Sequence, residues 1–460
     1  ERIEVVKGPQ GTLFGRNTSA GAISVISKKA IFGENTTEAK GGFGTEGQIL
    51  AQGVVNFATG ENGAVRFGAK LEERDGSFKN LTTGNELNNK KNMIFRAGWN
   101  QDLSENVNIN LMTEIMTDDS RWGVQFIDQD NRRNVEDEVY QGAREEQDVD
   151  SFRTALNLDY YINDNLTLTS ISSYTKVTSV TTPGDFDILA LDGDFEPTFM
   201  AGANDLQIDL LPFREPGEFE FFSTELRLNG STDSSDWFIG TSFRKDKLSN
   251  DTSIVGMNND HVGLLLEGED CETLIGPDPV CSIPAEEHSP ANVDVTSWGV
   301  YGDMTYHLSD NAEITLGGRY SQDKKTMDLV VTPNSGLFGI ATGGEALVKI
   351  IPGAANASDT WTDFSPRIAL SYNLTDDAML YGSYSKGFKS GGFNSTLFDD
   401  GSGNLQSLRV EPETNDAFEI GIKSDLLDGI ARFNAAMFYS DYNNFQAEVQ
   451  RGASFSIQNV

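Results

Sequence analysis

The stretch 312-AEITLGGRYSQD-323 decides the fold, because its apolar residues recur at every second position. Leu316 and Tyr320 fall on one face of an extended chain, while Arg319 and Ser321 fall on the other. Successive side chains of a β-strand point to opposite sides, so this pattern predicts a strand with one apolar and one polar face.

Segments of this kind, roughly ten residues long, recur along the chain from Glu38 to Gln446. We count about fifteen strands, with another predicted to start at Ser454. Short turns such as "STDSSD" and "LSDN" join the members of each pair. Long connections separate successive pairs, at about residues 117–147, 178–217, 248–292, 325–360 and 390–412.

This alternation places all tight turns at one end of the strands and all long loops at the other. Such polarity is typical of an outer-membrane β-barrel, whose apolar outer face meets lipid. A soluble β-sandwich or a β-solenoid is the alternative, and neither predicts the regular alternation of connection length. The predicted fold class is therefore all-β, a transmembrane antiparallel β-barrel.

Composition narrows the choice of partners. The chain has 460 residues and a formal net charge of −35, so a nucleic-acid backbone would be repelled over most of its surface. Aromatic residues make up 10%, which is high for a disordered chain. No run approaches about eighteen consecutive apolar residues, the length that predicts a membrane-spanning helix.

The opening stretch, 2-RIEVVKGPQGTLFGRNTSAGAISVISKK-29, contains a glycine-rich turn between two β-like runs. A phosphate-binding loop needs two glycines separated by four residues and followed by Lys and then Ser or Thr, and this spacing is absent. Gly8, Gly11 and Gly15 are better explained as positions of positive φ or of close backbone approach.

The same opening stretch closely resembles the C-terminal part of the plug domain of TonB-dependent outer-membrane receptors. The segments "LGGRYSQDKK", "DFSPRIALSYNLTDDAMLYGSYSKGFKSGGFN" and "VEPETNDAFEIGIKSDLLDG" resemble barrel strands of that family. The resemblance implies that residues 1–35 are the C-terminal part of a plug. It also implies that residues 36–460 are an incomplete barrel of about 15 of the family's 22 strands. We therefore expect an internal fragment of a longer receptor.

The resemblance further implies a place in the outer membrane of a Gram-negative bacterium and active uptake of a scarce nutrient, with an iron–siderophore complex as the leading ligand. Saccharide or cobalamin uptake and a passive porin-like barrel are the alternatives. The implied partners are outer-membrane lipid and lipopolysaccharide, and the TonB complex through a missing N-terminal segment. We expect no enzyme activity, because no catalytic motif stands out, and no cofactor or nucleic acid.

Charged residues of the plug segment are candidates for contacts with the barrel wall. Glu419 lies opposite Phe418 in the alternation and is predicted to point into the lumen. Arg2, Lys7 and Arg16 could form charge-assisted bonds with it. By resemblance, salt bridges of this kind occur in the family. The alternative is that all four are ordinary hydrated charges of the lumen.

Aromatic residues in the loops or on the inner face are candidates for ligand contact, and they are Trp122, Phe126, Tyr384, Phe388 and Phe393.

The remaining candidate sites are weaker. Cys271 and Cys281 flank the polar stretch "CETLIGPDPVC", where a local disulfide is favoured over a metal site or two free thiols. The three histidines are scattered without ligand spacing, so no metal site is predicted from them. The acidic loops could bind Ca²⁺ or Mg²⁺ adventitiously, but solvated external loops explain them as well.

Overall fold

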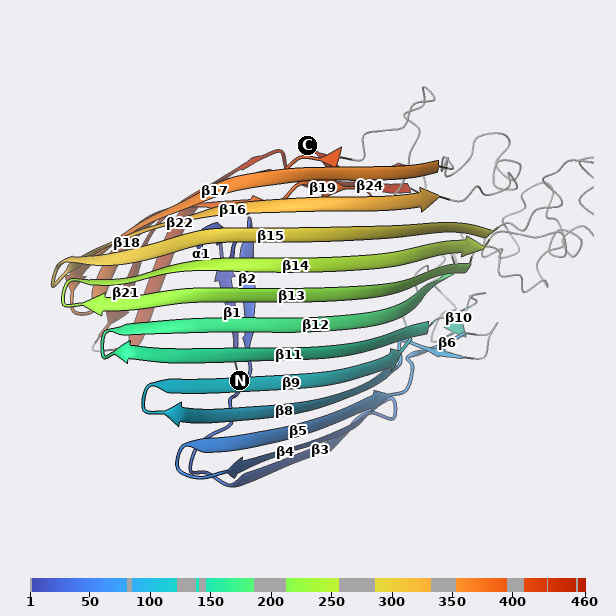
Figure 1. Ribbon diagram of the computed structural model, residues 1–460, viewed down its shortest axis with the longest axis horizontal. Helices are drawn as coiled ribbons and strands as arrows, with labels where there is room; N and C mark the ends of the chain where they lie inside the picture. The colour runs from blue at the N-terminus through green and yellow to red at the C-terminus, as the bar shows by residue number, and fades with distance from the viewer. Residues whose placement is uncertain are drawn as a thin grey trace, which may run out of the picture.

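The structure is a computed structural model of a chain built almost entirely from β-strands (Figure 1). It describes residues 2–80, 85–121, 138–139, 146–185, 212–255, 286–331, 353–394, 409–427, 429–451 and 454–460. Within these ranges no helix has the length and apolar character to cross a membrane.

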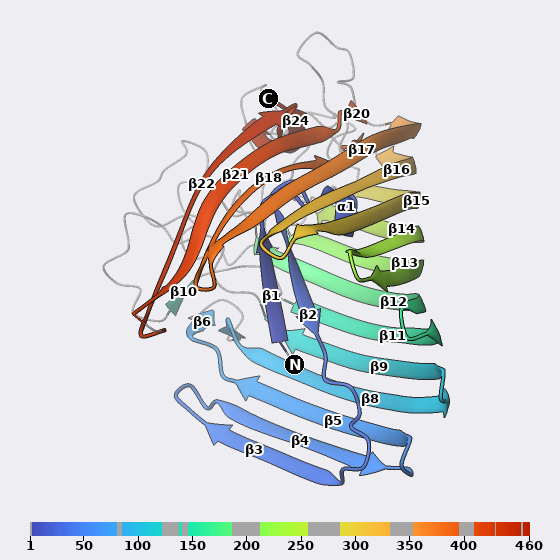
Figure 2. The same ribbon diagram turned by 90° about the vertical axis from the view of Figure 1, so that its left-hand side faces the viewer.

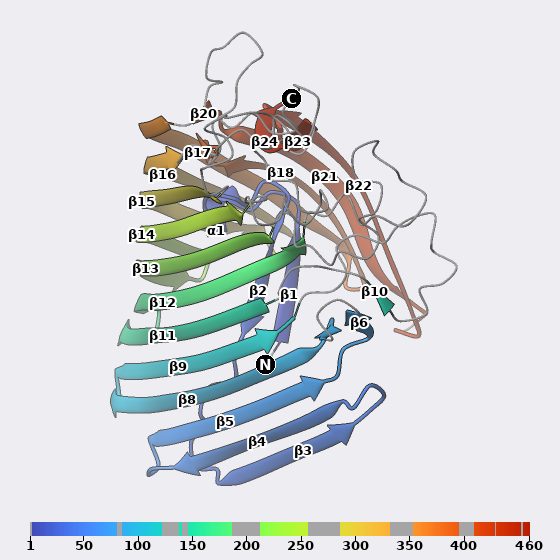
Figure 3. The same ribbon diagram turned by 90° about the vertical axis from the view of Figure 1, so that its right-hand side faces the viewer.

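The N-terminal segment folds as a hairpin with a helical turn at its tip. Strand β1 (Arg2–Lys7) pairs antiparallel with β2 (Gly21–Ile26), and one turn of helix, α1 (Gly11–Phe14), lies between them. Figures 2 and 3 show this hairpin on the concave side of a large curved sheet. α1 contacts four neighbouring strands of that sheet.

The large sheet contains 15 strands, each antiparallel to its neighbours, in the order β22-β21-β18-β17-β16-β15-β14-β13-β12-β11-β9-β8-β5-β4-β3. Its strands are β3 (Thr36–Phe43), β4 (Ile49–Ala58), β5 (Gly63–Arg74), β8 (Lys90–Ser104), β9 (Val107–Ser120), β11 (Glu146–Asn163), β12 (Leu166–Asp185), β13 (Pro212–Thr232), β14 (Ser235–Val255), β15 (Glu286–Ser309), β16 (Ala312–Val331), β17 (Gly353–Thr375), β18 (Ala378–Lys389), β21 (Glu413–Leu426) and β22 (Ala431–Asn443). The predicted antiparallel barrel wall of about fifteen strands is confirmed.

Three small sheets accompany the wall. They are β6 (Phe78–Asn80) with β7 (Glu86–Leu87) and β10 (Glu138–Val139), then β19 (Gly392–Phe393) with β20 (Arg409–Val410), and β23 (Gln446–Arg451) with β24 (Ser454–Asn459). In the last of these sheets, β24 begins at Ser454, where the sequence predicted the start of a strand.

Tight turns close one end of the wall, which lies at the left of Figure 1. Thr232 pairs with Ser235 across one such turn, and Ser309 pairs with Ala312 across another. The strands run well past the predicted length of roughly ten residues, and β15 has 24. The prediction was too short because the apolar period is needed only where lipid covers the wall, whereas ladder hydrogen bonds continue beyond that level.

Side chains alternate across the wall as predicted. Leu316 and Ile368 face outward with 51% and 46% of their surface exposed, at the level where the barrel fold places lipid. Arg319 lies on the opposite face and donates a hydrogen bond to Ser242 Oγ at 2.6 Å. The concave face is therefore polar, and we call it the inner wall.

Asn56, which is fully buried, joins the wall to the residues that follow the hairpin. Its side-chain oxygen accepts from Ile31 N at 2.9 Å, and its amide nitrogen donates to Ile31 O and Glu34 O at 2.9 and 2.7 Å. β3 begins two residues after Glu34, at Thr36. This amide thus fixes the path by which the chain passes from the lumen into the wall.

Candidate functional site

Residues 8–20, which we call the α1 turn, form a closed loop at the tip of the N-terminal hairpin. Gly8 N donates to Ala20 O at 3.1 Å, and Gln10 N donates to Thr18 O at 3.0 Å. Gly15 ends α1 with a φ of +76°, a conformation that glycine adopts without steric cost. The loop therefore keeps a fixed shape and can meet the inner wall as a unit.

Gly11 brings the α1 turn into close contact with β17 and β18. A Cβ atom at this position would lie 2.5 Å from Ser365 Oγ and 2.7 Å from Lys386 O. The neighbouring Thr12, which is buried, donates from Oγ1 to Ser365 O at 2.9 Å. Only glycine allows this approach, in agreement with the close-approach explanation of the sequence.

Arg16 forms the ionic contact between the α1 turn and the inner wall. Its Nη2 atom lies 2.6 Å from Asp246 Oδ2 on β14, and its Nη1 atom lies 3.6 Å from Asp323 Oδ1 on β16. The two carboxylate side chains are only 5% and 2% exposed. Asp246 also accepts from Arg244 Nε at 2.7 Å, so one carboxylate joins two guanidinium groups.

Arg319 of β16 lies against the α1 turn at Gly15. Its guanidinium group donates to Ser242 and Ser321 and lies 4.9 Å from the centre of the Tyr301 ring. A Cβ atom on Gly15 would come within 3.0 Å of Arg319 Nε. The sequence placed Arg319 on the polar face but gave no sign that it meets the N-terminal segment.

The end of the α1 turn bonds to the strands on either side of a long connection. Asn17 N donates to Phe388 O at 2.8 Å, at the end of β18. Ser19 Oγ donates to Glu413 Oε1 at 2.6 Å, and Asn415 Nδ2 donates to Ser19 O at 2.8 Å, both on β21. These partners are more than 360 residues away in sequence, so no local pattern could have predicted them.

The other predicted contacts of the N-terminal segment are placed differently. Arg2 pairs with Glu4 of its own strand at 2.5 Å, and the side chain of Lys7 is exposed. Glu419 is on the face of β21 that carries Glu413 and Asn415, but it accepts from the Tyr381 hydroxyl. The expected pairing with Glu419 is therefore corrected, because the α1 turn meets β21 at its first residues, Glu413 and Asn415, whereas Glu419 lies in the middle of the strand.

At the end of the wall away from the tight turns, an aromatic and cationic group gathers around Trp361. We call Trp361, Phe393, Lys325 and Arg409 the mouth cluster. Trp361 is 4% exposed, and its ring lies 5.4 Å from that of Phe393. Lys325 Nζ lies 5.6 Å from the Trp361 ring and also donates to Gly391 O. Arg409 lies 5.8 Å from the same ring.

The ligand-contact candidates divide between the two faces of the wall. Phe393 belongs to the mouth cluster, and Phe388 is buried beside the α1 turn, at 1% exposure. Tyr384 instead lies on the outer face, where its ring stacks on Phe418 at 4.9 Å. Its inclusion with inward or loop aromatics was wrong, because it is paired with outward-facing Ile368. Trp122 and Phe126 lie outside the described residues.

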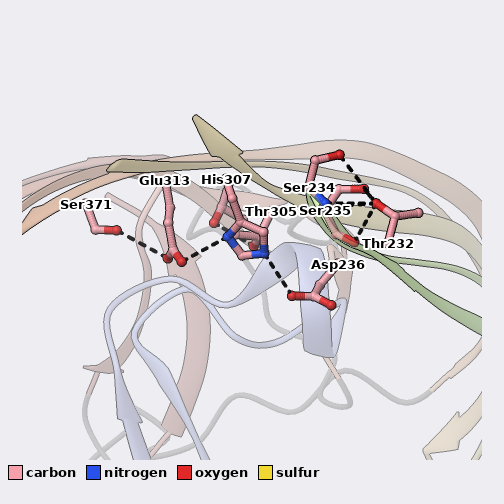
Figure 4. Close-up of polar contacts among 9 residues, drawn as sticks. Thr232, Ser234, Ser235, Asp236, Thr305, His307, Glu313 and Ser371 are labelled. Carbon is pink, nitrogen blue, oxygen red and sulfur yellow. Dashed lines mark hydrogen bonds and ion pairs between the residues drawn. The ribbon is translucent and has the colours of Figure 1, made fainter. Parts of the chain in front are cut away.

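A second polar cluster lies on the inner wall at the tight-turn end (Figure 4). His307 Nδ1 lies 3.0 Å from Glu313 Oε1, and its Nε2 lies 3.3 Å from Asp236 Oδ2. Ser371 Oγ donates to Glu313 Oε2 at 3.5 Å. The side chains of Asp236 and Glu313 are 64% and 49% exposed, so this cluster is hydrated where the Arg16 contact is buried.

Among the described residues no group of three His, Cys, Asp or Glu side chains is arranged to hold a metal ion. Cys271 and Cys281 lie outside the described residues, so the disulfide between them stays a prediction.

Residues 67–460 match the family model described as "TonB dependent receptor-like, beta-barrel". The chain is 21% identical, over 482 aligned positions, to a probable TonB-dependent receptor, BfrD, of Bordetella pertussis. That alignment covers 98% of this chain and 60% of the relative. A vitamin B12 transporter, BtuB, of Vibrio vulnificus is 27% identical over 165 residues, which cover 35% of this chain and 27% of the relative.

Among solved structures, the ferric yersiniabactin uptake receptor FyuA of Yersinia pestis superposes with a TM-score of 0.73 at 16% identity. The match covers 96% of this chain and 60% of that one. The ferripyoverdine receptor of Pseudomonas aeruginosa gives a TM-score of 0.69 at 17% identity, covering 97% and 54%. At these identities the likeness concerns the fold, and the chain spans about 60% or less of the length of these proteins.

Proposed function

The chain belongs to the TonB-dependent receptor family, a family of transport receptors, and we propose that it takes up an iron–siderophore complex by active transport across the outer membrane. The observation that carries this proposal is the α1 turn, which occupies the concave side of a barrel wall and is held there by buried contacts from Thr12, Arg16 and Ser19. A passive pore has no use for such an obstruction.

Residues 1–35 are assigned to the plug and residues 36–460 to the barrel. The start of β3 at Thr36 and the hydrogen bonds of Asn56 to residues 31 and 34 support this division. The outward apolar side chains of the wall would be covered by outer-membrane lipid and lipopolysaccharide. The protein lies in the outer membrane of a Gram-negative bacterium, as its family does.

Transport requires that the hydrogen bonds and ion pairs of the α1 turn break or rearrange, so that a passage opens along the inner wall. Energy for this step would come from the TonB complex, the partner from which the family takes its name. Because the departure of Arg16 would leave the buried Asp323 without this ion pair and Asp246 with Arg244 alone among the described residues, the closed arrangement is favoured without that input. We assign no catalytic step to any residue of this chain.

The iron–siderophore assignment is supported by solved receptors for ferric yersiniabactin and ferripyoverdine that share the fold. The side chains of the mouth cluster also support the assignment. Lys325 and Arg409 would place positive charge beside an anionic complex, although Arg409 also pairs with Asp359 and Glu411 at 2.6 and 2.7 Å and the chain as a whole is strongly acidic. Phe393 would offer aromatic surface, packed against the buried ring of Trp361. Cobalamin is the second candidate, because part of the chain aligns with a vitamin B12 transporter.

Uptake of radioactive iron tests the proposal. A strain that lacks the gene is grown under iron limitation and offered ferric catecholate, ferric hydroxamate and ferric citrate complexes in turn. We expect loss of energy-dependent uptake of at least one complex, restored by the wild-type gene. Normal uptake of every complex, together with impaired growth on cobalamin as the only source of that vitamin, would replace iron by cobalamin as the ligand.

A further inference from the structure

Glu413 is a buried carboxylate whose described contacts come from uncharged donors. Its side chain is 3% exposed and lies at the start of β21. Oε1 accepts from Ser19 Oγ of the α1 turn at 2.6 Å, and Oε2 accepts from Gln446 N at 2.9 Å. Burying a carboxylate is costly unless both oxygens are satisfied, so this residue depends on two partners from distant parts of the chain.

Gln446 continues the hydrogen bonds from Glu413 toward the mouth cluster. Its side-chain nitrogen donates to Glu411 O at 2.8 Å and to Ser390 O at 3.2 Å. Ser390 directly follows β18, and Glu411 directly follows β20. One glutamine therefore joins both ends of the connection that carries β19 and β20.

β19 and β20 supply two members of the mouth cluster. Phe393 of β19 pairs with Arg409 of β20, and both side chains approach the Trp361 ring. Lys325 reaches the same connection through its bond to Gly391 O. The geometry of the mouth cluster thus depends on how the connection leaves β18 and enters β21.

The α1 turn forms hydrogen bonds with the end of β18 and the start of β21, the same two strand ends, from the lumen side. Asn17 N donates to Phe388 O near the end of β18, and Asn415 Nδ2 donates to Ser19 O from β21. A continuous series of hydrogen bonds runs from Ser19 through Glu413 and Gln446 to Ser390 and Glu411. A displacement of the α1 turn must therefore break or shift the bonds at the base of the mouth cluster.

We propose that Glu413 is a positioning residue that couples the α1 turn to the mouth cluster. This inference rests on the proposed function, in which the turn moves and the cluster meets the ligand. Coupling between two sites is reciprocal in free energy, so ordering the mouth holds the turn in place, and releasing the turn loosens the mouth. The mouth cluster would then be fully assembled only while the lumen is closed.

Hydrogen exchange in the ligand-free, full-length receptor tests the coupling without any knowledge of the ligand. Ser19→Ala removes the hydroxyl that reaches Glu413. The matched control is Thr12→Val, which removes another buried hydrogen bond of the same α1 turn but one directed to β17. We expect Ser19→Ala to accelerate exchange of the β19 and β20 amides about fivefold or more, the lower range of coupling between sites.

We expect Thr12→Val to leave those amides unchanged while it accelerates exchange within the α1 turn. Equal acceleration of β19 and β20 by both variants would overturn the proposal, because any weakening of the turn would then suffice. So would the absence of any effect of Ser19→Ala at β19 and β20.

Substitutions of Glu413 show whether the coupling depends on its hydrogen bonds to Ser19 and Gln446, which we call the relay, or on its negative charge. A glutamine oxygen can accept from Gln446 N while its NH₂ group donates to Ser19 Oγ, so Glu413→Gln should keep exchange at β19 and β20 close to wild type. Glu413→Leu has similar size and makes neither bond, and it should match Ser19→Ala. If Glu413→Gln behaves like Glu413→Leu, the relay is refuted.

An uptake measurement distinguishes failure of this inference from failure of the proposed function. If wild-type receptor takes up none of the ferric complexes, the iron assignment fails, while the exchange result in ligand-free receptor still decides the coupling. If uptake is normal and the exchange variants show no distant effect, the coupling alone fails.

Discussion

The two halves of the N-terminal segment meet their surroundings in opposite ways. In the β1–β2 hairpin, Ile3 and Val25 are paired across the strands and are 68% and 63% exposed. The α1 turn buries Thr12 and Ser19 at 2% and 7% exposure. Among the described residues, the side-chain hydrogen bonds from residues 2–26 to the inner wall come from Thr12, Arg16 and Ser19 of the turn.

The difference shows that a short irregular segment, rather than the regular strands beside it, attaches the N-terminal segment to the wall. The strands pair with each other in a two-stranded ladder and leave apolar side chains such as Ile3 and Val25 exposed, so they bring no polar side chain into contact with the wall at these positions. The turn has backbone and side-chain groups that its own fold leaves free, and the polar inner wall supplies their partners.

The largest effect should come from Arg16→Ala. This change removes the guanidinium group that pairs with the buried Asp246 and Asp323 carboxylates, and among the described residues only Asp246 keeps a second ion pair, with Arg244. Breaking a buried ion pair costs about 3 kcal/mol, which corresponds to roughly 100-fold faster exchange of the Asn17 and Thr18 amides. Arg2→Ala is the control, because its partner Glu4 lies in the same exposed strand.

Equal exchange rates in the Arg16 and Arg2 variants would remove the distinction between turn and hairpin.

Gly11→Val should weaken the same contact by steric overlap. Its Cβ would lie within 2.8 Å of Ser365 and of the Lys386 carbonyl, so the turn or β17 has to shift. Overpacking of this kind costs about 2 kcal/mol. Limited proteolysis of the N-terminal segment in folded receptor measures the loss. Gly53→Ala on β4, where a Cβ meets nothing within 4 Å, should leave the digestion rate unchanged.

Resistance of the Gly11→Val variant equal to that of the wild type would mean that the turn does not touch the wall as closely as the structure shows.

Arg319→Lys should have an intermediate effect. Lysine keeps the charge but loses the planar group that bonds to Ser242 and Ser321 and faces the Tyr301 ring. We expect a loss of about 1 kcal/mol in the stability of the closed turn. Exchange of the Gly15 and Arg16 amides should rise several-fold, while β1 and β2 exchange as before. Uniform acceleration across the whole segment would argue for a general loss of fold instead.

The smallest effect should come from the tight-turn cluster in Figure 4. Like Arg16, His307 lies between two carboxylates, but its partners are largely exposed. Hydrated ion pairs contribute little, so His307→Asn should change the melting temperature by about one degree or less. If His307→Asn lowered stability by as many kcal/mol as Arg16→Ala, burial would not explain the difference between the two clusters.

Sequence alone predicted the wall because a period of two is a local property that each strand carries by itself. Trp361 and Asp363 alternate with Phe364, so their place on the inner face could have been read from the same pattern. The ionic role of Arg16 was predicted, but its partners were not. Asp246 and Asp323 lie 230 and 307 positions away, and nothing local specifies which level of the wall the turn reaches.

Tyr384 shows what happens when the two-residue period of a strand is not applied. Tyr381 and Tyr384 are three residues apart and therefore point to opposite faces, Tyr381 toward Glu419 and Tyr384 toward Phe418. Closeness to a loop does not determine on which face of a strand an aromatic side chain lies, so it does not predict contact with a ligand in the lumen. The mouth cluster was missed in part for a related reason, since it joins β16, β17, β19 and β20.

A double-mutant cycle between Arg16 and Asp246 tests most directly whether the buried ion pair of the α1 turn holds the N-terminal segment on the wall. The free energy of opening is measured from amide exchange at Asn17 in wild type, Arg16→Gln, Asp246→Asn and the double variant. We expect a coupling energy of about 1.5 kcal/mol or more, as close charged pairs give. A coupling energy indistinguishable from zero would contradict the account, because the segment would then be held by contacts other than the buried ion pair.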